Sequence, residues 1–413
     1  MSVDAIRSRI ERGRATRDSL LLYCQHSLGM GHLVRSMALT RELARHYDVA
    51  FVNGGRLPPG VAPPPDVRIV QLPPLGMDEV GDLVSLDDSL TVDECFARRT
   101  LTLLTTLEQA RPRVLVIELF PFGRKKFARE LRPLLEHARA VSPAPLVLCS
   151  LRDILVGGRE DQQSFDDRAA EQLDRWFDGV LVHADPRFAR LEESFRPTRA
   201  PRVPIHYTGF VTAARADAGH EREQRVLVSA GGGIVGGPLL GAAVDAHREL
   251  WPATGIPMTL VAGPFLPDAE WRALERCAAG MPGLTLLRSV PDLGAAMRSV
   301  TMSVSQCGYN TAMDFLSAGV KPLVVPFTRT QENEQLNRAE RLERLGLVRL
   351  LREETLDGAT LARELRRFAD FTPDRAAFDF DGAATSARLI ARLVEPDATP
   401  MTAATPMTME AAR

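Results

Sequence analysis

Short apolar segments alternate with longer amphipathic segments along most of the chain, and this alternation predicts the secondary structure. Near the N-terminus, the apolar run LLLYCQHS is followed by LVRSMALTRELARHY and then by the apolar run DVAFVNGG. Further apolar runs, VRIVQL, RVLVIEL, PLVLCSL and GVLVHA, predict strands, and helices are predicted over 93–110, 122–140 and 166–178. Strands that alternate with helices are typical of βαβ units around a parallel sheet. The pattern therefore predicts a doubly wound α/β fold.

The alternation stops and then restarts near residue 225, which predicts two domains. Beyond the small, charged segment 211–224, the runs RVLVSAGGG, MTLVAG, LTLLRSV, MSVSQCG and KPLVVPF predict a second set of strands. Two such sheets would face each other across a cleft, and ligands commonly bind in a cleft of this kind. We predict a charged N-terminal extension over 1–19, a first domain over 20–210, the linker 211–224, a second domain over 225–372, a C-terminal helix within 373–396 and a disordered tail over 397–413.

Composition argues against several classes of function. The formal net charge of −2 gives no bulk field to attract nucleic acid. The five cysteines are scattered without a CxxC motif or a Cys/His pairing, which argues against a disulfide framework and against a zinc site. The sequence shows neither a signal peptide nor a run of about 18 apolar residues. We therefore expect a cytoplasmic protein with no nucleic-acid partner.

A Pro-rich segment over 57–75 predicts an exposed loop around one strand. Apolar residues in and next to this segment are candidates for a weak peripheral membrane contact. These residues are Leu57, Leu72, Leu75 and Met77.

The first strand-to-helix junction of interest is QHSLGMGHLVRS, because chemistry in α/β sheets lies at the carboxyl ends of strands. Gly29 and Gly31 allow a sharp bend, and His32 then falls in the first turn of the next helix, where it faces the predicted cleft. A GxG motif is a weak signal by itself. A glycine turn with a solvent-exposed histidine explains this junction equally well.

The second junction, VSAGGGIVGG, has more glycines than a turn needs. Glycine lets a backbone approach a phosphate closely, so Gly231, Gly232 and Gly233 are candidate phosphate neighbours. The segment is neither a Walker loop nor a GxGxxG motif, because its spacing differs from both. The alternative is a flexible loop.

The third junction, SQCGYNTAMDFLSAG, is the most informative. Ser305, Asn310 and Thr311 are natural helix-capping residues, so the simplest interpretation is a capped helix. Capping leaves Asp314 unexplained, as well as Glu334 and Gln335 after the following strand. Helix-start amides that hold a diphosphate and a carboxylate that accepts ribose hydroxyls would suit a nucleotide.

The stretch SQCGYNTAMDFLSAGVKPLVVPFTRTQENEQLNRAERLERLGL resembles the donor-sugar signature of GT-B glycosyltransferases. The similarity is greatest to the group that contains the N-acetylglucosaminyltransferase forming lipid II and related predicted bacterial glycosyltransferases. It extends from about residue 20 to residue 395. It implies two Rossmann-like domains, with the acceptor on the N-terminal side of the cleft and a nucleotide sugar, UDP-linked, on the C-terminal side. The nucleotide sugar is then a substrate, and no cofactor is expected.

The resemblance also implies roles for individual residues. Ser305, Gly308, Asn310 and Thr311 would hold the diphosphate, Asp314 the ribose, Glu334 and Gln335 the sugar hydroxyls, and the backbone of Val290 the base edge. GMGH matches the family's first glycine loop at Gly29, Gly31 and His32. Asp stands at 314 where the relatives usually have Glu, and the loop over 327–335 is about one residue longer, so the sugar is not determined.

Inverting transfer needs a base for the acceptor hydroxyl and positive or dipolar groups for the departing diphosphate. We predict His32 as that base, with Glu118 at the end of RVLVIEL either orienting the imidazole or acting itself. Arg152 and Asp153 are candidate acceptor contacts, although a structural ion pair explains them equally well. Arg35 is a candidate for the leaving-group charge or a surface residue.

Metal catalysis fits the sequence poorly. The strict DxD motif, Asp379-Phe380-Asp381, lies near the C-terminus, away from the glycine loops.

Two other functions use the same fold. The segment GMGHLVRSMALTREL is also similar to a UDP-sugar hydrolase of nonulosonic-acid synthesis, which leaves hydrolase or epimerase open, and a non-catalytic nucleotide-sugar-binding module is the third possibility. A pure binder would not need His32 and Glu118 together in one cleft.

Overall fold

The computed structural model describes most of the chain. The described residues are 17–26, 31–57, 63–78, 81–157, 159–212, 221–328, 333–368, 370–374 and 377–395. Most of the predicted N-terminal extension and linker, the predicted disordered tail and Gly29 lie outside them.

The N-terminal half forms a parallel sheet of seven strands in the order β3-β2-β1-β6-β7-β8-β9. Its central strands are apolar runs that are buried along almost their whole length. The strands are β1 (Ser19–Cys24), β2 (Asp48–Asn53), β3 (Arg68–Gln71), β6 (Val114–Glu118), β7 (Leu146–Leu151), β8 (Gly179–Val182) and β9 (Ile205–Tyr207). The α-helices are α2 (Gly31–Leu43), α3 (Val92–Ala110), α4 (Ala128–Ala140) and α5 (Gln162–Trp176), and the 3-10 turns are η1 (Lys125–Phe127) and η2 (Leu191–Glu193).

The C-terminal half forms a second parallel sheet of six strands in the order β12-β11-β10-β13-β14-β15. The strands are β10 (Glu223–Ser229), β11 (Met258–Val261), β12 (Leu284–Leu287), β13 (Val300–Ser305), β14 (Lys321–Val324) and β15 (Arg349–Leu350). The helices are α6 (Gly237–Thr254), α7 (Asp268–Ala278), α8 (Leu293–Arg298), α9 (Tyr309–Ala318), α10 (Glu334–Arg344), η3 (Glu353–Thr355), α11 (Gly358–Phe368) and α12 (Gly382–Val394).

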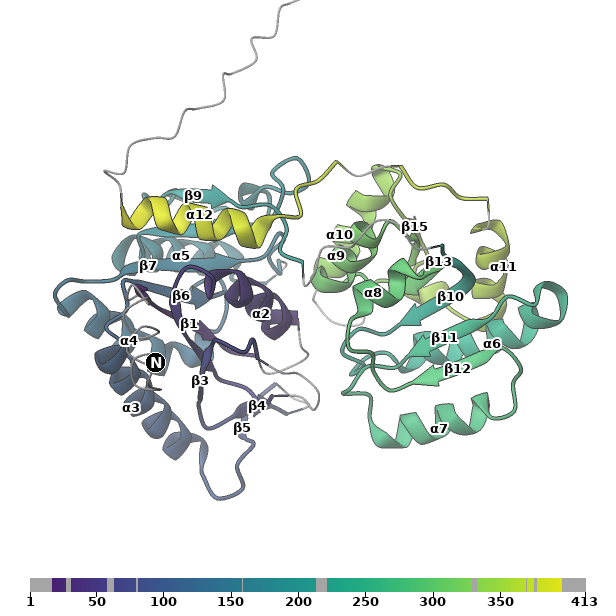
Figure 1. Cartoon of the computed structure of the whole chain (residues 1–413), viewed down its shortest axis with the longest axis horizontal. Coiled ribbons are helices and arrows are strands. Elements are labelled where there is room, and N and C mark those ends of the chain that lie inside the picture. Colours follow the sequence, from purple (N-terminus) through teal and green to yellow (C-terminus); the bar gives the residue numbers. More distant parts are fainter. Residues whose placement is uncertain are drawn as a thin grey trace, which may run out of the picture.

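Figure 1 shows the two sheets as separate halves, with α12 returning from the C-terminal half to lie over the N-terminal half. α12 packs against α2, and its buried residues Ala387 and Ile390 join the hydrophobic core formed by β1 and α2. The last helix thus belongs structurally to the first domain. The predicted doubly wound α/β fold with two Rossmann-like domains is confirmed.

A short antiparallel ribbon corrects the prediction of an exposed Pro-rich loop. β4 (Leu75–Met77) pairs with β5 (Leu83–Ser85). Leu72 and Leu75 are fully buried in the main core, because the ribbon folds the chain back over the sheet. These two leucines therefore cannot form the predicted membrane contact. Within the described residues, every helix is too short or too polar to cross a membrane.

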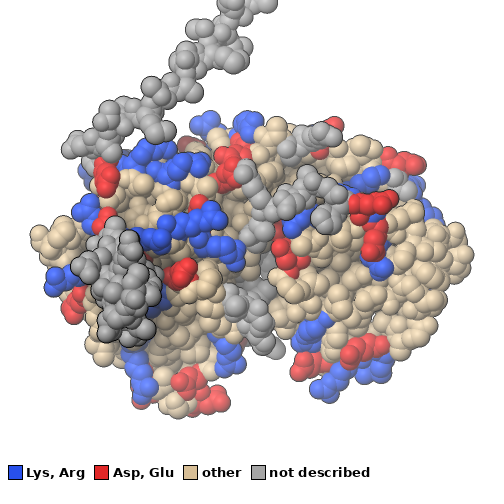
Figure 2. All heavy atoms as spheres, in the orientation of Figure 1, with Lys and Arg blue, Asp and Glu red and all other residues tan. Residues whose placement is uncertain are grey.

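The surface carries charges of both signs. On the face that Figure 2 shows, Lys and Arg side chains and Asp and Glu side chains both occur on each half of the molecule. This distribution agrees with the formal net charge of −2.

Candidate functional site

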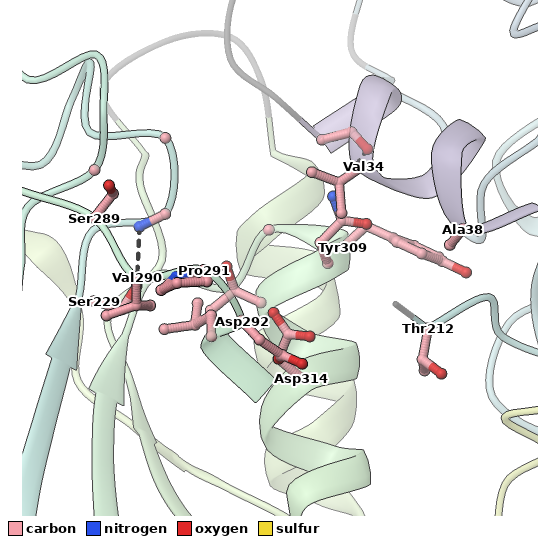
Figure 3. Close-up of a pocket in the computed structure, with 18 of the residues that line it drawn as sticks. Val34, Ala38, Thr212, Ser229, Ser289, Val290, Pro291, Asp292, Tyr309 and Asp314 are labelled. Carbon is pink, nitrogen blue, oxygen red and sulfur yellow. Dashed lines mark hydrogen bonds between the residues drawn. The ribbon is translucent and has the colours of Figure 1, made fainter. Parts of the chain in front are cut away.

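A cavity of about 950 Å³ lies between the two halves, lined by α2 on one side and by the strand-to-helix loops of the second sheet on the other (Figure 3). This volume suits a ligand of several hundred daltons, since small-molecule sites typically span about 300–1,000 Å³. The predicted donor residues that line it are Gly31, Gly231, Gly232, Val290, Gly308, Asn310, Thr311, Asp314 and Gln335.

Helix α9 starts at this cavity without a side-chain cap. Its N-cap residue is Gly308, which has no side chain to accept a hydrogen bond from the first turn of the helix. Asn310 instead donates from Nδ2 to the carbonyl oxygen of Gly31 across the cleft, at 2.9 Å. The capping interpretation of this segment is therefore wrong. The first-turn N–H groups and the positive end of the helix dipole are available to an anion in the cavity. Ser305 is fully buried at the end of β13 and does not line the cavity.

The glycine loop after β10 divides into two parts with different roles. Gly231 and Gly232 line the cavity, and the backbone N–H of Gly231 donates to Ser229 Oγ at 3.3 Å (Figure 3). Gly233 packs instead against the loop after β11. A Cβ on Gly263 in that loop would lie 2.5 Å from backbone atoms of Gly232 and Gly233, so only glycine allows the two loops to meet. The excess of glycines thus reflects close packing of two loops as well as a phosphate-sized opening.

Two carboxylates lie close together in the wall of the cavity. Asp314 on α9 is half-buried, and Asp292 caps α8 by accepting a hydrogen bond from the N–H of Ala295 at 2.8 Å. Their side chains lie side by side in Figure 3, and an Oδ1 atom of each is 3.3 Å from the place that a Cβ on Gly294 would occupy. Burial and the negative charge of Asp292 raise the pKa of Asp314 to about 7. Asp314 is therefore close to half-ionised at neutral pH.

The structure brings His32 and Glu118 together, although 86 residues separate them in sequence. Glu118 ends β6 and is fully buried, while His32 lies in the first turn of α2. His32 Nδ1 and Glu118 Oε1 are 2.6 Å apart. Because an ionised carboxylate only accepts hydrogen bonds, Nδ1 carries the proton and Nε2 keeps a lone pair. This is the tautomer that a general base requires.

Two arginines flank this pair, and we call His32, Arg35, Glu118 and Arg124 the base cluster. Arg35 is buried and donates from Nη2 to the same Glu118 oxygen. Arg124 Nη2 lies 3.9 Å from Glu118 Oε2. Burial raises the pKa of Glu118, but His32, Arg35 and Arg124 outweigh it and lower that pKa to about 2. Burial also lowers the pKa of His32 to about 3, so His32 is neutral above this pH.

Arg152, Asp153, Glu334 and Arg338 form a second buried cluster, which we call the interdomain clasp. Arg338 donates from Nε and Nη2 to the two oxygens of Asp153, at 2.8 and 2.7 Å, and from Nη2 to Glu334 Oε1 at 2.6 Å. Arg152 pairs with Glu334 Oε2 at 2.6 Å. The predicted acceptor contacts thus pair with α10 of the other domain, and Glu334 lies away from the cavity that Gln335 lines.

Several cavity residues were not predicted from the sequence. Asp292 had a weak signal, since it precedes the small helical segment LGAAMR as a natural cap. Tyr309 and Gly263 had no local signal, because their importance comes from contacts with distant segments. Other residues of the cavity wall that were missed are Ser229, Ser289, Pro291 and Gln306.

The described residues contain no group of three or more His, Cys, Asp and Glu side chains positioned to hold a metal ion. Asp379 and Asp381 lie just before α12, where the N–H of Asp381 donates to Asp379 Oδ1 at 2.8 Å. This motif leads into a helix, but Phe380 and Asp381 line the same cavity as Gly231 and Gly232, so the motif is not remote from the cavity as predicted.

Residues 278–391 match the model of the glycosyltransferase family 28 C-terminal domain. No curated protein matches the chain. Solved structures with a similar fold include MurG from Acinetobacter baumannii, which is 15% identical, with 92% of this chain and 99% of that one covered and a TM-score of 0.53.

Two further structures share the fold. UGT2 of Phytolacca americana, solved with UDP-2-fluoro-glucose and pterostilbene, is 15% identical over 92% of this chain and 94% of that one, with a TM-score of 0.53. A candidate UDP-N-acetylglucosamine 2-epimerase from Listeria monocytogenes is 11% identical over 93% and 98%, with a TM-score of 0.60. The predicted resemblance is therefore confirmed: this chain has the two-domain fold of GT-B glycosyltransferases, and its C-terminal half carries a match to the family 28 C-terminal domain.

Proposed function

We propose that this protein transfers a sugar from a UDP-linked donor to an acceptor hydroxyl, with inversion at the anomeric carbon and without a metal ion. The observation that carries the proposal is the His32–Glu118 pair, whose Nδ1 and Oε1 atoms are 2.6 Å apart. Neither residue lines the cavity, but Gly31, the residue before His32, does. A binding module would have no use for a buried carboxylate that fixes a histidine tautomer. The family 28 match and the UDP-sugar ligand of a fold relative support the donor class.

In the proposed reaction, the acceptor oxygen attacks the anomeric carbon from the face opposite the diphosphate. The new carbon–oxygen bond forms as the bond to the diphosphate breaks, and the bonding electrons leave with the diphosphate. The acceptor proton passes to His32 Nε2, while Glu118 stabilises the imidazolium that forms. Burial lowers the pKa of His32 to about 3, so its Nε2 lone pair is free at neutral pH, and proton transfer to it would depend on Glu118 stabilising the imidazolium.

The donor side of the cavity would hold the nucleotide mainly through backbone groups. The α9 N-terminus and the glycine loop at Gly231 and Gly232 would bind the diphosphate and stabilise its charge as it leaves. Asp314 would accept the ribose hydroxyls, the backbone of Val290 would face the base, and Gln335 would contact the sugar. Backbone dipoles would thus replace the metal ion that other sugar-transfer enzymes use.

Arg152 and Asp153 take a different role in this proposal from the predicted acceptor contacts. Both are engaged with Glu334 and Arg338, and Arg338 is fully buried. An acceptor would have to break these pairs to reach them, at a high cost for buried charges. We therefore assign them to holding the two domains together.

The alternative function is hydrolysis or epimerisation of a UDP-sugar, and the similar Listeria structure carries the description of a candidate UDP-N-acetylglucosamine 2-epimerase. A thermal-shift screen of UDP-, dTDP- and GDP-linked sugars identifies the donor, because a ligand that binds only the folded state raises its melting temperature. The donor is then incubated with the protein and chromatographed, without and with a panel of hydroxyl acceptors. If the protein is a transferase, UDP should be released rapidly only when an acceptor is present. UDP and free sugar without an acceptor would indicate a hydrolase, a C2 epimer would indicate an epimerase, and the absence of any stabilising nucleotide sugar would contradict the proposal.

A further inference from the structure

Tyr309, the first residue of α9, ties the donor side of the cavity to the N-terminal domain. Its side chain is buried, and its hydroxyl donates to the carbonyl oxygen of His183 at 2.9 Å. The same hydroxyl accepts a hydrogen bond from the backbone N–H of Val211 at 3.0 Å. His183 directly follows β8, and Val211 lies four residues after β9, so both partners come from the chain that leaves the first sheet. The residue after the Gly308 cap is therefore fixed to the opposite domain.

The ring of Tyr309 also lies between two buried arginines. The guanidinium carbon of Arg35 is 5.2 Å from the ring centroid, and that of Arg338 is 5.9 Å from it. Both distances are within the range of a cation–π interaction. Figure 3 shows Tyr309 reaching from the start of α9 toward α2, the helix that carries Arg35 and His32. Arg35 in turn donates to Glu118, which is bonded to His32.

We propose that Tyr309 is a positioning residue that couples the helix holding the donor diphosphate to the His32–Glu118 pair through the Arg35 guanidinium. The inference rests on the proposed function and adds a residue of the cavity wall whose effect on the base passes through Arg35. Its physical basis is that the base belongs to the N-terminal domain, whereas the anomeric carbon of the donor would be held by the C-terminal domain. Small errors in their relative position cost large factors in rate, about 100-fold for a displacement near 1 Å.

Removing the hydroxyl of Tyr309 distinguishes this positioning role from simple packing of the ring. A phenylalanine would fill the same space, but it would lose the two hydrogen bonds, to the His183 carbonyl and from the Val211 N–H, that fix the position of the ring against Arg35. Arg35 has little freedom to compensate, since it is 2% exposed and both Glu118 and the ring restrain it. The nearby charges of Asp153 and Arg338 belong to the clasp and are paired with each other.

The test compares Tyr309→Phe with the matched control Tyr207→Phe. The Tyr207 hydroxyl also accepts a backbone N–H bond, from Leu191 at 2.7 Å, but the bond lies within the first domain. For Tyr309→Phe we expect kcat to fall about tenfold, because the base loses its alignment, while the donor Kd stays within about twofold. Tyr207→Phe should leave both within about twofold. A Tyr309→Phe enzyme with unchanged kcat, or with only its donor Kd changed, would overturn the inference.

A double-mutant cycle with Arg35→Lys tests the route through Arg35. Lysine keeps the charge but loses the planar group over the ring. If Tyr309 acts through Arg35, the double variant should lose no more kcat than Arg35→Lys alone, whereas multiplying losses would contradict the coupling. Arg35→Lys alone should lower kcat by a similar factor, so this variant also serves if Tyr309→Phe does not fold; an unchanged kcat would then overturn the inference.

A readout without turnover separates this inference from the proposed function. With 13C-labelled histidine, the His32 signal is assigned from its loss in His32→Ala and then compared between the wild type and Tyr309→Phe. We expect the chemical shift and pH titration of His32 to change in Tyr309→Phe and not in Tyr207→Phe. An active wild type with an unchanged His32 signal in Tyr309→Phe would refute the coupling, whereas a changed signal in a protein that transfers no sugar would refute only the proposed function.

Discussion

The base cluster and the interdomain clasp are both buried groups of charged side chains at the cleft, but they differ in how completely their atoms are paired. In the clasp, all three nitrogens of the Arg338 guanidinium donate, two to Asp153 and one to the carbonyl oxygen of Cys307, and Arg152 Nε is the clasp atom that is buried without a hydrogen-bond partner among the described residues. In the base cluster, Glu118 Oε2 is buried with no hydrogen-bond partner among the described residues. Arg35 Nε and two nitrogens of Arg124 are likewise buried without a partner there.

The difference suggests different tasks for the two clusters. Buried polar atoms are nearly always paired in proteins, and a guanidinium whose nitrogens all donate, as in Arg338, fixes a conformation. Unpaired buried charge is costly, and it collects at sites where a substrate or water completes the set. The clasp is therefore expected to govern stability, and the base cluster to govern turnover.

The largest expected effect on stability comes from breaking the clasp. Asp153→Ala leaves the fully buried Arg338 without its two-oxygen partner, which typically costs about 3–5 kcal/mol. Urea denaturation measures the loss. The double variant Asp153→Leu with Arg338→Met is the control, because replacing both partners by apolar groups should recover much of that stability. A loss below about 1 kcal/mol in Asp153→Ala would mean that the clasp does not hold the domains.

The next effect concerns the donor side of the cavity. Asp314→Ala should weaken UDP binding by about 1.5–3 kcal/mol, because a charged hydrogen-bond partner of the ribose is lost. Calorimetry with the full chain measures it. Asp292→Asn tests the neighbouring carboxylate, because an amide oxygen can still accept the hydrogen bond from Ala295 N–H while the charge that raises the pKa of Asp314 is removed. We expect this variant to bind UDP at pH 7 at least as tightly as the wild type. Equal affinity in Asp314→Ala and the wild type would remove Asp314 from the nucleotide site.

A smaller effect should appear in the pH dependence, where donor affinity and kcat are expected to respond differently. The pKa of Asp314 is raised to about 7, so its acceptor form is lost as pH falls through 7. Donor affinity should fall about tenfold between pH 8 and pH 6, in step with the ionised fraction. His32, with a pKa of about 3, stays neutral throughout this range, so kcat at saturating donor should stay nearly constant. The change in affinity should disappear in Asp314→Asn, and its persistence there would assign the titration to another group.

The smallest expected effect is that of a chelator. Excess EDTA should leave turnover unchanged, because backbone donors at α9 and the glycine loop are proposed to carry the leaving-group charge. A full loss that Mg²⁺ or Mn²⁺ restores would contradict the proposal and point to acids such as Asp87, Asp88, Asp166 or Asp167. Partial stimulation by Mg²⁺ would not, since the ion also binds free UDP and speeds its release.

Much of this arrangement follows from local sequence. Apolar runs and glycine junctions predict parallel strands whose carboxyl ends meet at one edge, and that rule alone places His32 and Glu118 on the same side of the first sheet. The glycine loop and the α9 start follow from the same rule in the second sheet. The sequence therefore predicts which of these residues lie at the same edge of each sheet, but not the distances between their atoms.

The remaining features depend on contacts between distant segments. Arg338 and Asp153 are 185 residues apart in sequence, and the partners of Tyr309 lie 98 and 126 residues away. No local periodicity specifies how the two sheets face each other, so Arg152 and Asp153 resemble acceptor contacts until their partners are seen. Leu72 and Leu75 were misjudged for a similar reason, because burial under the β4–β5 ribbon is not visible in a Pro-rich segment.

The central claim is that His32 removes the acceptor proton, and the most direct test is to measure turnover and donor affinity of His32→Ala in the same preparation. Loss of a general base typically lowers the rate about 10²- to 10⁴-fold. The account predicts a loss of this size in kcat, with the donor Kd within about threefold of the wild type because His32 belongs to the opposite domain. A His32→Ala enzyme that keeps kcat within a factor of a few would contradict the claim and transfer the role of base to Glu118.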